Sequence, residues 1–210
     1  MAQITSGVRS ILSRPSVYAL LQTIMGADQA RRDFTRDFIK PFPGMKILDI
    51  GCGPADILAY LPDHVEYWGF DISDVYIDQA RTRFAARQAH FFNEQLEREH
   101  LSQLPHFDLV LASGLLHHLD DEPARDIMQL SATALVDGGK LLTIDPCFTP
   151  DQSMLSRFLV SNDRGQNVRV KAEYEALAAS TFPKRSVQVR HRAWIPYTHC
   201  IMECWKSLTA

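Results

Sequence analysis

The sequence predicts an α/β protein with a doubly wound, mostly parallel sheet and helices on both of its faces. Short apolar runs such as Ile47–Ile50 alternate with segments of helical periodicity, as in a parallel sheet joined by crossover helices. The glycine turn Gly51-Cys52-Gly53 follows the first run directly. Asp71 ends the second run, close to the ~20-residue spacing at which such an acid reaches ribose hydroxyls. A ligand site is therefore expected at the carboxyl ends of the strands.

Length and composition restrict the class of protein. With 210 residues, 46% hydrophobic and 22% charged, we expect one domain over residues 1–210. No run approaches the ~20 apolar residues of a membrane span, and Arg9 and Arg14 interrupt the N-terminal apolar pieces, so we expect a cytoplasmic protein without a membrane partner. The net charge of -3, without a basic run, predicts no nucleic-acid partner. A small-molecule substrate and a monomer or homodimer are expected.

The cysteines do not form a recognisable site. Cys52, Cys147, Cys200 and Cys204 show no Cys-x-x-Cys pair and no matching histidine spacing, so neither a zinc site nor a disulfide framework is indicated. We expect no metal. Cys200 and Cys204 are expected to be small buried side chains of a C-terminal strand.

Helices are predicted before the first strand. Ile4–Leu12 and Val17–Met25 carry apolar residues at helical spacing, and Asp28–Ile39 continues with a charged outer face. Pro41-Phe42-Pro43-Gly44 then ends the helix. We expect the helices of residues 1–42 to form a lid.

The middle of the chain alternates between strands and helices. Strands are expected at Val65–Phe70, Ala89–Asn93, Phe107–Ala112 and Lys140–Ile144. The segment Ala55–Tyr60 is expected to begin a crossover helix, and further helices are expected at Asp74–Arg87 and Glu122–Leu135. Ser73 or Asp74 is a plausible N-cap, and Asp137-Gly138-Gly139 is expected to turn the chain into the fifth strand.

The pattern changes beyond Pro146. Residues 148–184 are polar, and their apolar periodicity is interrupted. Helices are expected within this range at Ser153–Val160 and Ala172–Thr181. Two β-rich segments, Arg185–Trp194 and Thr198–Lys206, follow around Pro196 and are expected to pair antiparallel at one sheet edge.

The charges around the glycine turn indicate the kind of ligand. A pyrophosphate-binding turn has a third glycine where this chain has Asp56, which would repel a pyrophosphate. Asp49 precedes the first glycine, where a carboxylate suits a cationic ligand. These acids favour S-adenosyl-L-methionine, whose ammonium and sulfonium groups are both positive, over a dinucleotide.

The run Ile47-Leu48-Asp49-Ile50-Gly51-Cys52-Gly53 is similar to motif I of the class I S-adenosylmethionine-dependent methyltransferases. The resemblance extends over roughly residues 45–148, with Ala55 in place of the family's frequent third glycine. It implies a Rossmann-like, seven-stranded sheet with an antiparallel edge strand. It also implies a division into an N-terminal helical lid at 1–42, a cofactor-binding core at 45–146, a substrate-side insertion at 147–184 and antiparallel edge strands at 185–206.

The resemblance also implies which residues bind the cofactor. Asp49, Gly51, Cys52 and Gly53 would surround its methionine part, Asp71 would bind the ribose hydroxyls, Ile72 would pack on the adenine, Glu94 or Gln95 would read the adenine amino group, and Ser113 and His118 would lie beside the reacting end. The alternatives are a turn without a ligand and, for Glu94 and Gln95, a solvated loop.

Chemistry is expected after the fourth strand, at Ser113-Gly114-Leu115-Leu116-His117-His118. This segment resembles that of small-molecule methyltransferases and lacks the Asn/Asp-Pro-Pro-Tyr/Phe motif of enzymes that methylate nucleic-acid amines. His117 is a candidate general base, because imidazole accepts a proton at neutral pH. The alternative is that one of the two histidines caps the following helix or packs against it.

Substrate-binding residues are predicted in the C-terminal third of the chain. Arg164 or Arg169, in a polar stretch, could hold a carboxylate or phosphate, and a corner containing Tyr197 and His199 could reach over the pocket. The alternatives are a surface loop and simple packing of the sheet edge. A role for Cys147 as a covalent nucleophile is disfavoured, because the basic surface of RNA-modifying enzymes is absent from the sequence.

The sequence thus predicts a methyltransferase acting on a small molecule, with an oxygen acceptor favoured by family analogy. The product would be S-adenosyl-L-homocysteine. The alternative is a catalytically silent cofactor-binding protein with a regulatory or scaffold role. A nicotinamide-dependent oxidoreductase is disfavoured by Asp56.

Overall fold

The computed structural model describes residues 27–162, 165–191 and 197–208. The helices expected at Ile4–Leu12 and Val17–Met25 lie outside these ranges, as does Arg164, which was predicted to bind substrate.

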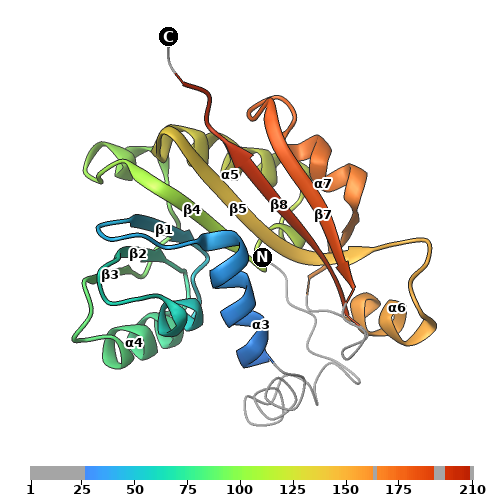
Figure 1. Ribbon diagram of the computed structural model, residues 1–210, viewed down its shortest axis with the longest axis horizontal. Helices are drawn as coiled ribbons and strands as arrows, with labels where there is room; N and C mark the ends of the chain where they lie inside the picture. Colours follow the sequence, from blue (N-terminus) through green and yellow to red (C-terminus); the bar gives the residue numbers. More distant parts are fainter. Residues whose placement is uncertain (1–26, 163–164, 192–196, 209–210) are drawn as a thin grey trace.

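A mixed sheet runs through the molecule, and helices lie on both of its faces (Figure 1). Its strands are β1 (Lys46–Ile50), β2 (Glu66–Phe70), β3 (Ala89–Phe92), β4 (Phe107–Ser113), β5 (Leu135–Phe148), β6 (Arg169–Val170), β7 (Lys184–His191) and β8 (Thr198–Trp205). Their order is β3-β2-β1-β4-β5-β8-β7, and β6 pairs with β5. β1 to β5 are parallel, whereas β8 is antiparallel to β5 and β7. The predicted fold class is confirmed, with the short β6 as an addition.

The helices occupy the segments between the strands. They are α3 (Ala27–Phe34), α4 (Asp74–Arg83), α5 (Asp121–Ala134), α6 (Met154–Ser161) and α7 (Lys171–Ala178), with shorter turns η1 (Thr35–Ile39), η2 (Asp56–Tyr60), η3 (Arg98–Ser102) and η4 (Leu116–His118). The Ser73 hydroxyl accepts a hydrogen bond from the Tyr76 backbone N–H at 3.4 Å, which confirms the predicted N-cap of α4.

Each face of the sheet has its own hydrophobic core. One core contains side chains of α5 and α7 with Val110 and Ala112 of β4, and the other contains side chains of η1, η2 and β4 residues Leu109 and Leu111. These β4 side chains are at most 1% exposed. Because the central strands are buried on both faces, they form continuous apolar runs, which is why the sequence identified them.

The described part of the predicted lid packs against the sheet. Phe34 and Phe38 lie in the core, and Arg31 of α3 binds Asp56 of η2 at 3.0 Å. Residues 27–39 are therefore an integral part of the fold. A lid stays a prediction for residues 1–26 alone.

The crossover helix expected from Ala55 is only the short turn η2. Ala55 has a left-handed φ of 54°, and Leu61 is extended, with φ -94° and ψ 143°. Pro62 follows, and a proline disfavours the helical conformation of the residue before it. The helix therefore ends at Tyr60.

The turn expected at residues 137–139 lies within β5. The pairing of β4 with β5 shifts between Phe107↔Leu135 and Leu109↔Lys140, so the extra residues form an irregularity in the ladder rather than a separate loop. Gly138 accommodates it with a φ of 76°.

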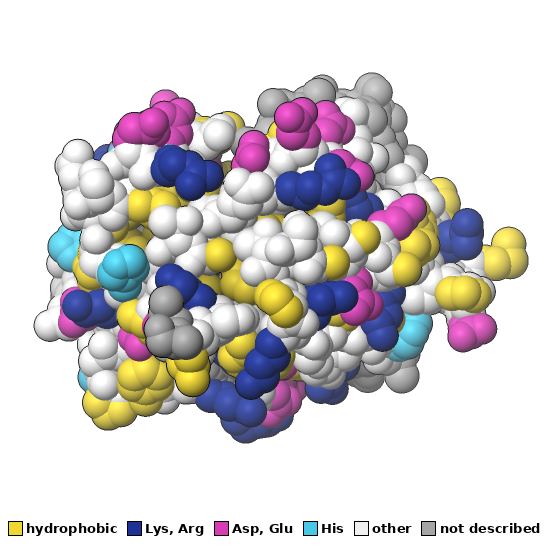
Figure 2. All heavy atoms as spheres, turned by 90° about the horizontal axis from the view of Figure 1, so that it is seen from above, with side chains coloured by type: hydrophobic (Ala, Val, Ile, Leu, Met, Phe, Trp, Pro, Cys, Tyr) yellow, Lys and Arg dark blue, Asp and Glu magenta, His cyan; other side chains and the backbone are white. Residues whose placement is uncertain are grey.

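The burial expected of two cysteines is confirmed. Cys200 and Cys204 of β8 are 2% and 0% exposed, and both are free thiols. Cys147 of β5 is also a buried free thiol. Figure 2 shows acidic and basic side chains interspersed on the face seen from above.

Candidate active site

The glycine turn after β1 is held in a left-handed conformation at both glycines. φ is 72° at Gly51 and 54° at Gly53, which glycine adopts with little strain. A Cβ atom added to Gly53 would meet no atom within 4 Å, so the backbone is open to a ligand here. Cys52 lies between them, half-buried, and burial raises the pKa of its thiol, which keeps it neutral.

Asp49 is a buried carboxyl group at the end of β1. The Tyr67 hydroxyl of β2 donates a hydrogen bond to Asp49 Oδ2 at 2.5 Å. The other oxygen, Oδ1, is buried without a hydrogen-bond partner among the described residues. Burial raises the pKa of Asp49 to about 7, although the Tyr67 hydrogen bond acts in the opposite direction.

Asp71 connects the end of β2 to the glycine turn. Its Oδ2 accepts the Gly53 backbone N–H at 2.9 Å, and its Oδ1 accepts the Ser73 N–H at 2.8 Å. Each carboxylate oxygen has a further lone pair, so this arrangement orients Asp71 and still allows two hydroxyl donors to bind. Ile72 follows with 55% exposure, which makes its apolar side chain available to a flat ring.

The predicted adenine-reading residues follow β3 and are exposed. A carboxylate oxygen of Glu94 lies 3.5 Å from His100 Nε2, and Gln95 is the next residue along the exposed chain. The Asn93 side-chain amide donates to the Asp71 carbonyl at 3.2 Å, which holds this loop beside the end of β2. The loop thus lies near the predicted ribose site. Both Glu94 and Gln95 stay candidates for reading the adenine amino group.

His117 and Asp145 form a buried pair at the ends of neighbouring strands. His117 Nδ1 lies 2.8 Å from Asp145 Oδ1, and the His117 backbone N–H donates to the same oxygen at 3.2 Å. Their side chains are 6% and 1% exposed. Asp145 Oδ2 is buried without a hydrogen-bond partner among the described residues. The His118 ring lies with its centroid 4.1 Å from that of His117, and Ser113 is exposed at the end of β4.

Asp145 is a functional candidate that the sequence reasoning did not connect with His117. The two residues are 28 positions apart, so no local motif joins them. The available signal was topological, because β4 and β5 are adjacent parallel strands whose carboxyl ends must meet.

The segment of residues 165–168 packs directly on His117. The Asn167 backbone N–H donates to the His117 carbonyl at 2.9 Å. A Cβ atom added to Gly165 would overlap His117 Cδ2 and would lie 2.5 Å from its carbonyl oxygen. Residues 165–168 therefore form a closely fitted wall of the site.

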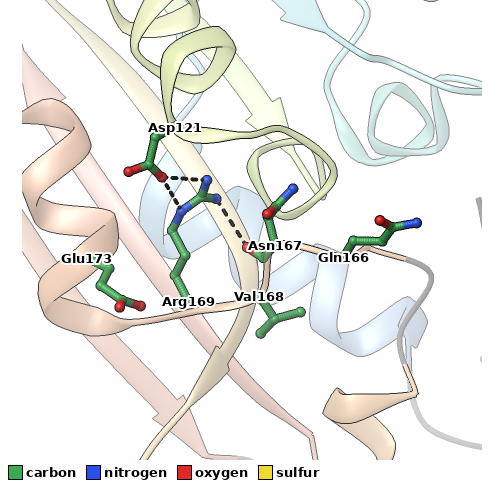
Figure 3. A pocket seen from close by; sticks show the side chains of 6 residues that line it. All are labelled: Asp121, Gln166, Asn167, Val168, Arg169 and Glu173. Atoms are coloured by element: carbon green, nitrogen blue, oxygen red, sulfur yellow. Dashed lines mark hydrogen bonds and ion pairs between the residues drawn. The ribbon is translucent and has the colours of Figure 1, made fainter. Parts of the chain in front are cut away.

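Arg169 holds this wall in place. Its guanidinium donates to the carbonyl oxygens of Leu116 at 2.9 Å, Leu119 at 2.7 Å and Asn167 at 3.1 Å. It also binds Asp121 Oδ1 through Nε at 3.1 Å and Nη2 at 2.9 Å. Figure 3 shows the contacts of Arg169 with Asp121 and Asn167. These three residues line a polar hollow, whose volume is about 240 Å³. Because Arg169 is 6% exposed and committed to these partners, the prediction that it binds an anionic acceptor is replaced by a structural role.

The predicted corner at Tyr197 and His199 lies beside the end of β5. His199 is the register partner of Pro146, and the Tyr197 and His199 ring centroids are 5.0 Å apart. The intervening Thr198 is buried, and its hydroxyl lies 3.2 Å from the Ser156 hydroxyl of α6. The corner is therefore near Asp145, while its contact with a substrate stays a prediction.

Within residues 27–162, 165–191 and 197–208, no group of three or more His, Cys, Asp or Glu side chains is arranged to hold a metal ion. In the same ranges, none of the helices is both long and apolar enough to cross a bilayer.

Comparisons with known proteins identify the core. Residues 48–141 match the family model described as a methyltransferase domain. This part of the chain is similar to a methyltransferase domain. An O-methyltransferase family protein from Burkholderia thailandensis aligns with a TM-score of 0.68 and 17% identity over 100% of this chain and 65% of that one. The S-adenosylmethionine-dependent methyltransferase SibL aligns with a TM-score of 0.68 and 18% identity over 96% of this chain and 59% of SibL.

A relative by sequence is much longer than this chain. The chain is 30% identical over 114 residues to the probable non-canonical nonribosomal peptide synthetase CymA of Salinispora arenicola. The match covers 52% of this chain and 2% of CymA. At these identities the solved structures establish the fold, and the acceptor must be inferred from the site.

The site fits S-adenosylmethionine, which the family uses as methyl donor. Asp49 Oδ1 is a buried acceptor that lacks a donor among the described residues, which suits the ammonium group of the methionine part. Gly53 leaves open space, and Asp71 and Ile72 lie in sequence where the ribose and adenine would follow. The carboxylate of Asp56 forms ion pairs with the guanidinium groups of Arg31 and Arg83, at 3.0 and 2.6 Å.

Proposed function

We propose that this protein is a methyltransferase that transfers a methyl group from S-adenosyl-L-methionine to a hydroxyl oxygen of a small molecule, releasing S-adenosyl-L-homocysteine. The buried pair of His117 and Asp145 supports this proposal best, because it provides a general base two residues after Leu115, whose side chain lies against Gly51 of the cofactor turn. Methyl transfer to a hydroxyl requires loss of a proton, whereas a neutral amine can attack before it loses one. A histidine with a carboxylate partner therefore favours oxygen.

The cofactor, when bound, supplies an electrophilic methyl group on its sulfonium. The chain's residues bind and align it: Asp49 and the turn hold the methionine part, and Asp71 holds the ribose hydroxyls. On the acceptor side, Asp145 fixes His117 through Nδ1, which assigns proton acceptance to Nε2. The carboxylate of Asp145 then stabilises the imidazolium that forms.

The acceptor is proposed to lie between two walls. Ser113 and His118 flank one side, and the Gly165–Arg169 segment with the corner at Tyr197 and His199 forms the other. Proximity and orientation account for much of the rate enhancement in such a site, because the reacting oxygen, carbon and sulfur must lie in line. Arg169 is assigned to holding the wall, so an anionic group on the acceptor is no longer required.

An amine acceptor is the second candidate. The 30% identity with part of a probable nonribosomal peptide synthetase favours including amino acids and other amines among the compounds tested. A catalytically silent cofactor-binding protein is the remaining alternative. Cytoplasmic location and a monomeric or homodimeric state stay predictions of the sequence.

A direct assay separates these functions. The purified protein is incubated with S-adenosylmethionine and a panel of phenols, hydroxylated metabolites and amino acids, and release of S-adenosylhomocysteine is measured. Release with hydroxyl compounds supports the proposal, and release with amines alone transfers it to the second candidate. Cofactor binding by calorimetry, without release for any compound, favours the silent protein.

A further inference from the structure

Tyr67 has an unusual position for a buried tyrosine in a parallel strand. Its register partner in β1 is Ile47, whereas Asp49 is the partner of Gly69. The Tyr67 ring therefore extends along its own strand, past Gly69, to reach Asp49 Oδ2 at 2.5 Å. Tyr67 is 0% exposed, so its hydroxyl needs a partner inside the protein.

Gly69 makes this path possible. A Cβ atom added there would lie 3.0 Å from Tyr67 Cε1 and 2.8 Å from Cys52 Sγ. Any larger residue would push the tyrosine ring or the cysteine of the cofactor turn. The glycine, the tyrosine and the acid thus form one fitted unit between β1 and β2.

The hydrogen bond from Tyr67 makes the two oxygens of the Asp49 carboxyl group different from one another. Oδ2 is occupied by the tyrosine, and Oδ1 stays buried without a donor among the described residues. A buried acceptor without a donor is costly, and its presence indicates a group that arrives with a ligand. The family resemblance places the cofactor's methionine part at this position.

The charged state of Asp49 depends on the groups that face it. Burial and the negative charge of Asp71 raise its pKa to about 7, while the Tyr67 hydrogen bond lowers it. Cys52 faces both acids, and burial keeps its thiol neutral. The pKa of Tyr67 is itself raised by burial and by Asp49, so its hydroxyl remains a proton donor to the carboxylate.

We propose that Tyr67 is a positioning residue for the cofactor, which holds Asp49 with Oδ1 directed to the ammonium of the methionine part and favours the ionised carboxyl group. This inference rests on the proposed cofactor, not on the acceptor. Cofactor binding is then linked to the loss of a proton from Asp49, because the ammonium binds the carboxylate and not the neutral acid. Below pH 7 the affinity should fall, by up to about tenfold per pH unit for one linked proton.

The test is calorimetry on the full chain with S-adenosylmethionine and S-adenosylhomocysteine between pH 5.5 and 7.5, in two buffers of different ionisation enthalpy. The wild type should bind both nucleosides more tightly as pH rises and should release protons into the buffer. Tyr67→Phe should bind them more weakly at pH 7 and shift the midpoint of the pH dependence upward. Asp49→Asn should abolish the pH dependence.

Tyr174→Phe is the matched control. Tyr174 is 1% exposed, and its hydroxyl donates to the Pro146 carbonyl at 2.9 Å, so this variant also loses one buried hydrogen bond. Its midpoint should equal that of the wild type. If Tyr67→Phe does not fold, Gly69→Ala serves instead, because its methyl group displaces the same ring, and it should shift the midpoint in the same direction.

The outcomes are distinguishable. Failure of the wild type to bind either nucleoside at any pH overturns the proposed function. Tight binding with no proton release, or an equal midpoint in the wild type and Tyr67→Phe, overturns only the role of Tyr67. A pH dependence seen with S-adenosylmethionine and not with S-adenosylhomocysteine also overturns it, since both share the ammonium group.

Discussion

His117 donates its backbone N–H and presents its ring Nδ1 to one and the same carboxylate oxygen of Asp145, at 3.2 and 2.8 Å. The two contacts fix both the position of the main chain and the orientation of the ring. They also join the end of β4 to the end of β5. In the proposed reaction, a histidine held in this way needs little movement of its ring before it accepts a proton.

Replacement of Asp145 tests whether this carboxylate orients the His117 ring. Asp145→Asn should lower turnover on an identified acceptor by about 100-fold or more, the scale of general acid–base catalysis, as should His117→Ala. Cofactor affinity should be unchanged in both variants. In Asp145→Asn, ¹⁵N NMR should also show a changed tautomer of His117, and this measurement needs no acceptor.

Asp126→Asn is the control for that experiment, because Asp126 is an exposed acid of α5 outside the site. It should retain wild-type turnover. Unchanged turnover in Asp145→Asn and His117→Ala would remove the general base from the proposal.

Asp71 should contribute to both cofactor binding and the shape of the turn. Asp71→Ala should weaken S-adenosylmethionine binding by about 1.5–3 kcal/mol, the scale of a hydrogen bond to a charged group. Isothermal calorimetry measures the change, and urea unfolding should show a smaller loss of stability from the freed Gly53 and Ser73 N–H groups. Asp74→Ala is the control, since Asp74 is an exposed acid in the first turn of α4. An equal dissociation constant for Asp71→Ala and wild type would contradict the ribose assignment.

Two glycines allow the effect of a ligand site to be separated from backbone strain. Gly53 and Gly44 have φ of 54° and 76°, and neither has an atom within 4 Å of an added Cβ. Gly53→Ala and Gly44→Ala should therefore destabilise the fold similarly, by about 1–2 kcal/mol. Only Gly53→Ala should weaken cofactor binding, and Gly53→Val should abolish it. Equal binding by both alanine variants would show that the turn does not contact the cofactor.

Most of the sheet could be predicted because its central strands are continuous apolar runs. The run Ile47–Ile50 lies within β1, and Phe107–Ala112 lies within β4. The two-residue strand β6 has no pattern of its own and is defined by its pairing with β5. The length of η2 was also missed, because the influence of Pro62 was not weighed against the helical periodicity.

The site was predictable only where its residues belong to one local motif. Asp49, Gly51 and Gly53 are adjacent in sequence and carry a recognisable pattern. The partners of Asp49 and His117 come from other strands, so Tyr67 and Asp145 become visible only when the register is known. Arg169 was misread for the same reason: its carbonyl partners belong to a segment that is 50 to 53 residues away.

Arg169 should stabilise the protein without binding the acceptor. Arg169→Met leaves the Leu116 and Leu119 carbonyls without their donor, and we expect a loss of about 2–3 kcal/mol in the free energy of unfolding. Because Asp121 is 59% exposed, that ion pair should contribute little of this, and Asp121→Asn should cost less than about 1 kcal/mol. Urea unfolding measures both.

Arg87→Met is the matched control for Arg169. Arg87 also donates to backbone carbonyls, those of Leu58, Leu61 and Pro62, but lies far from His117 in the order of the sheet. Both variants should lose stability, whereas the His117 signals in ¹⁵N NMR should change in Arg169→Met alone. Unchanged His117 signals in Arg169→Met would show that the wall does not position the ring.

Asp49 should make the protein less stable as the pH rises from 4 to 7. Its pKa is about 7 in the folded protein and near 3.8 when unfolded, so between these values the folded state binds the extra proton. The free energy of unfolding must then decrease with increasing pH, by at most about 1.4 kcal/mol per unit from this one group. Asp49→Asn removes the group, so its stability should decrease less over the same range, as measured by urea unfolding at pH 4.5, 5.5, 6.5 and 7.5.

Saturating S-adenosylmethionine should restore stability to the wild type at pH 7.5 more than at pH 5.5, because the cation binds the carboxylate. Parallel stability curves for the wild type and Asp49→Asn would mean that Asp49 titrates at its ordinary pKa, and that the buried oxygen facing the cofactor site is not protonated at neutral pH.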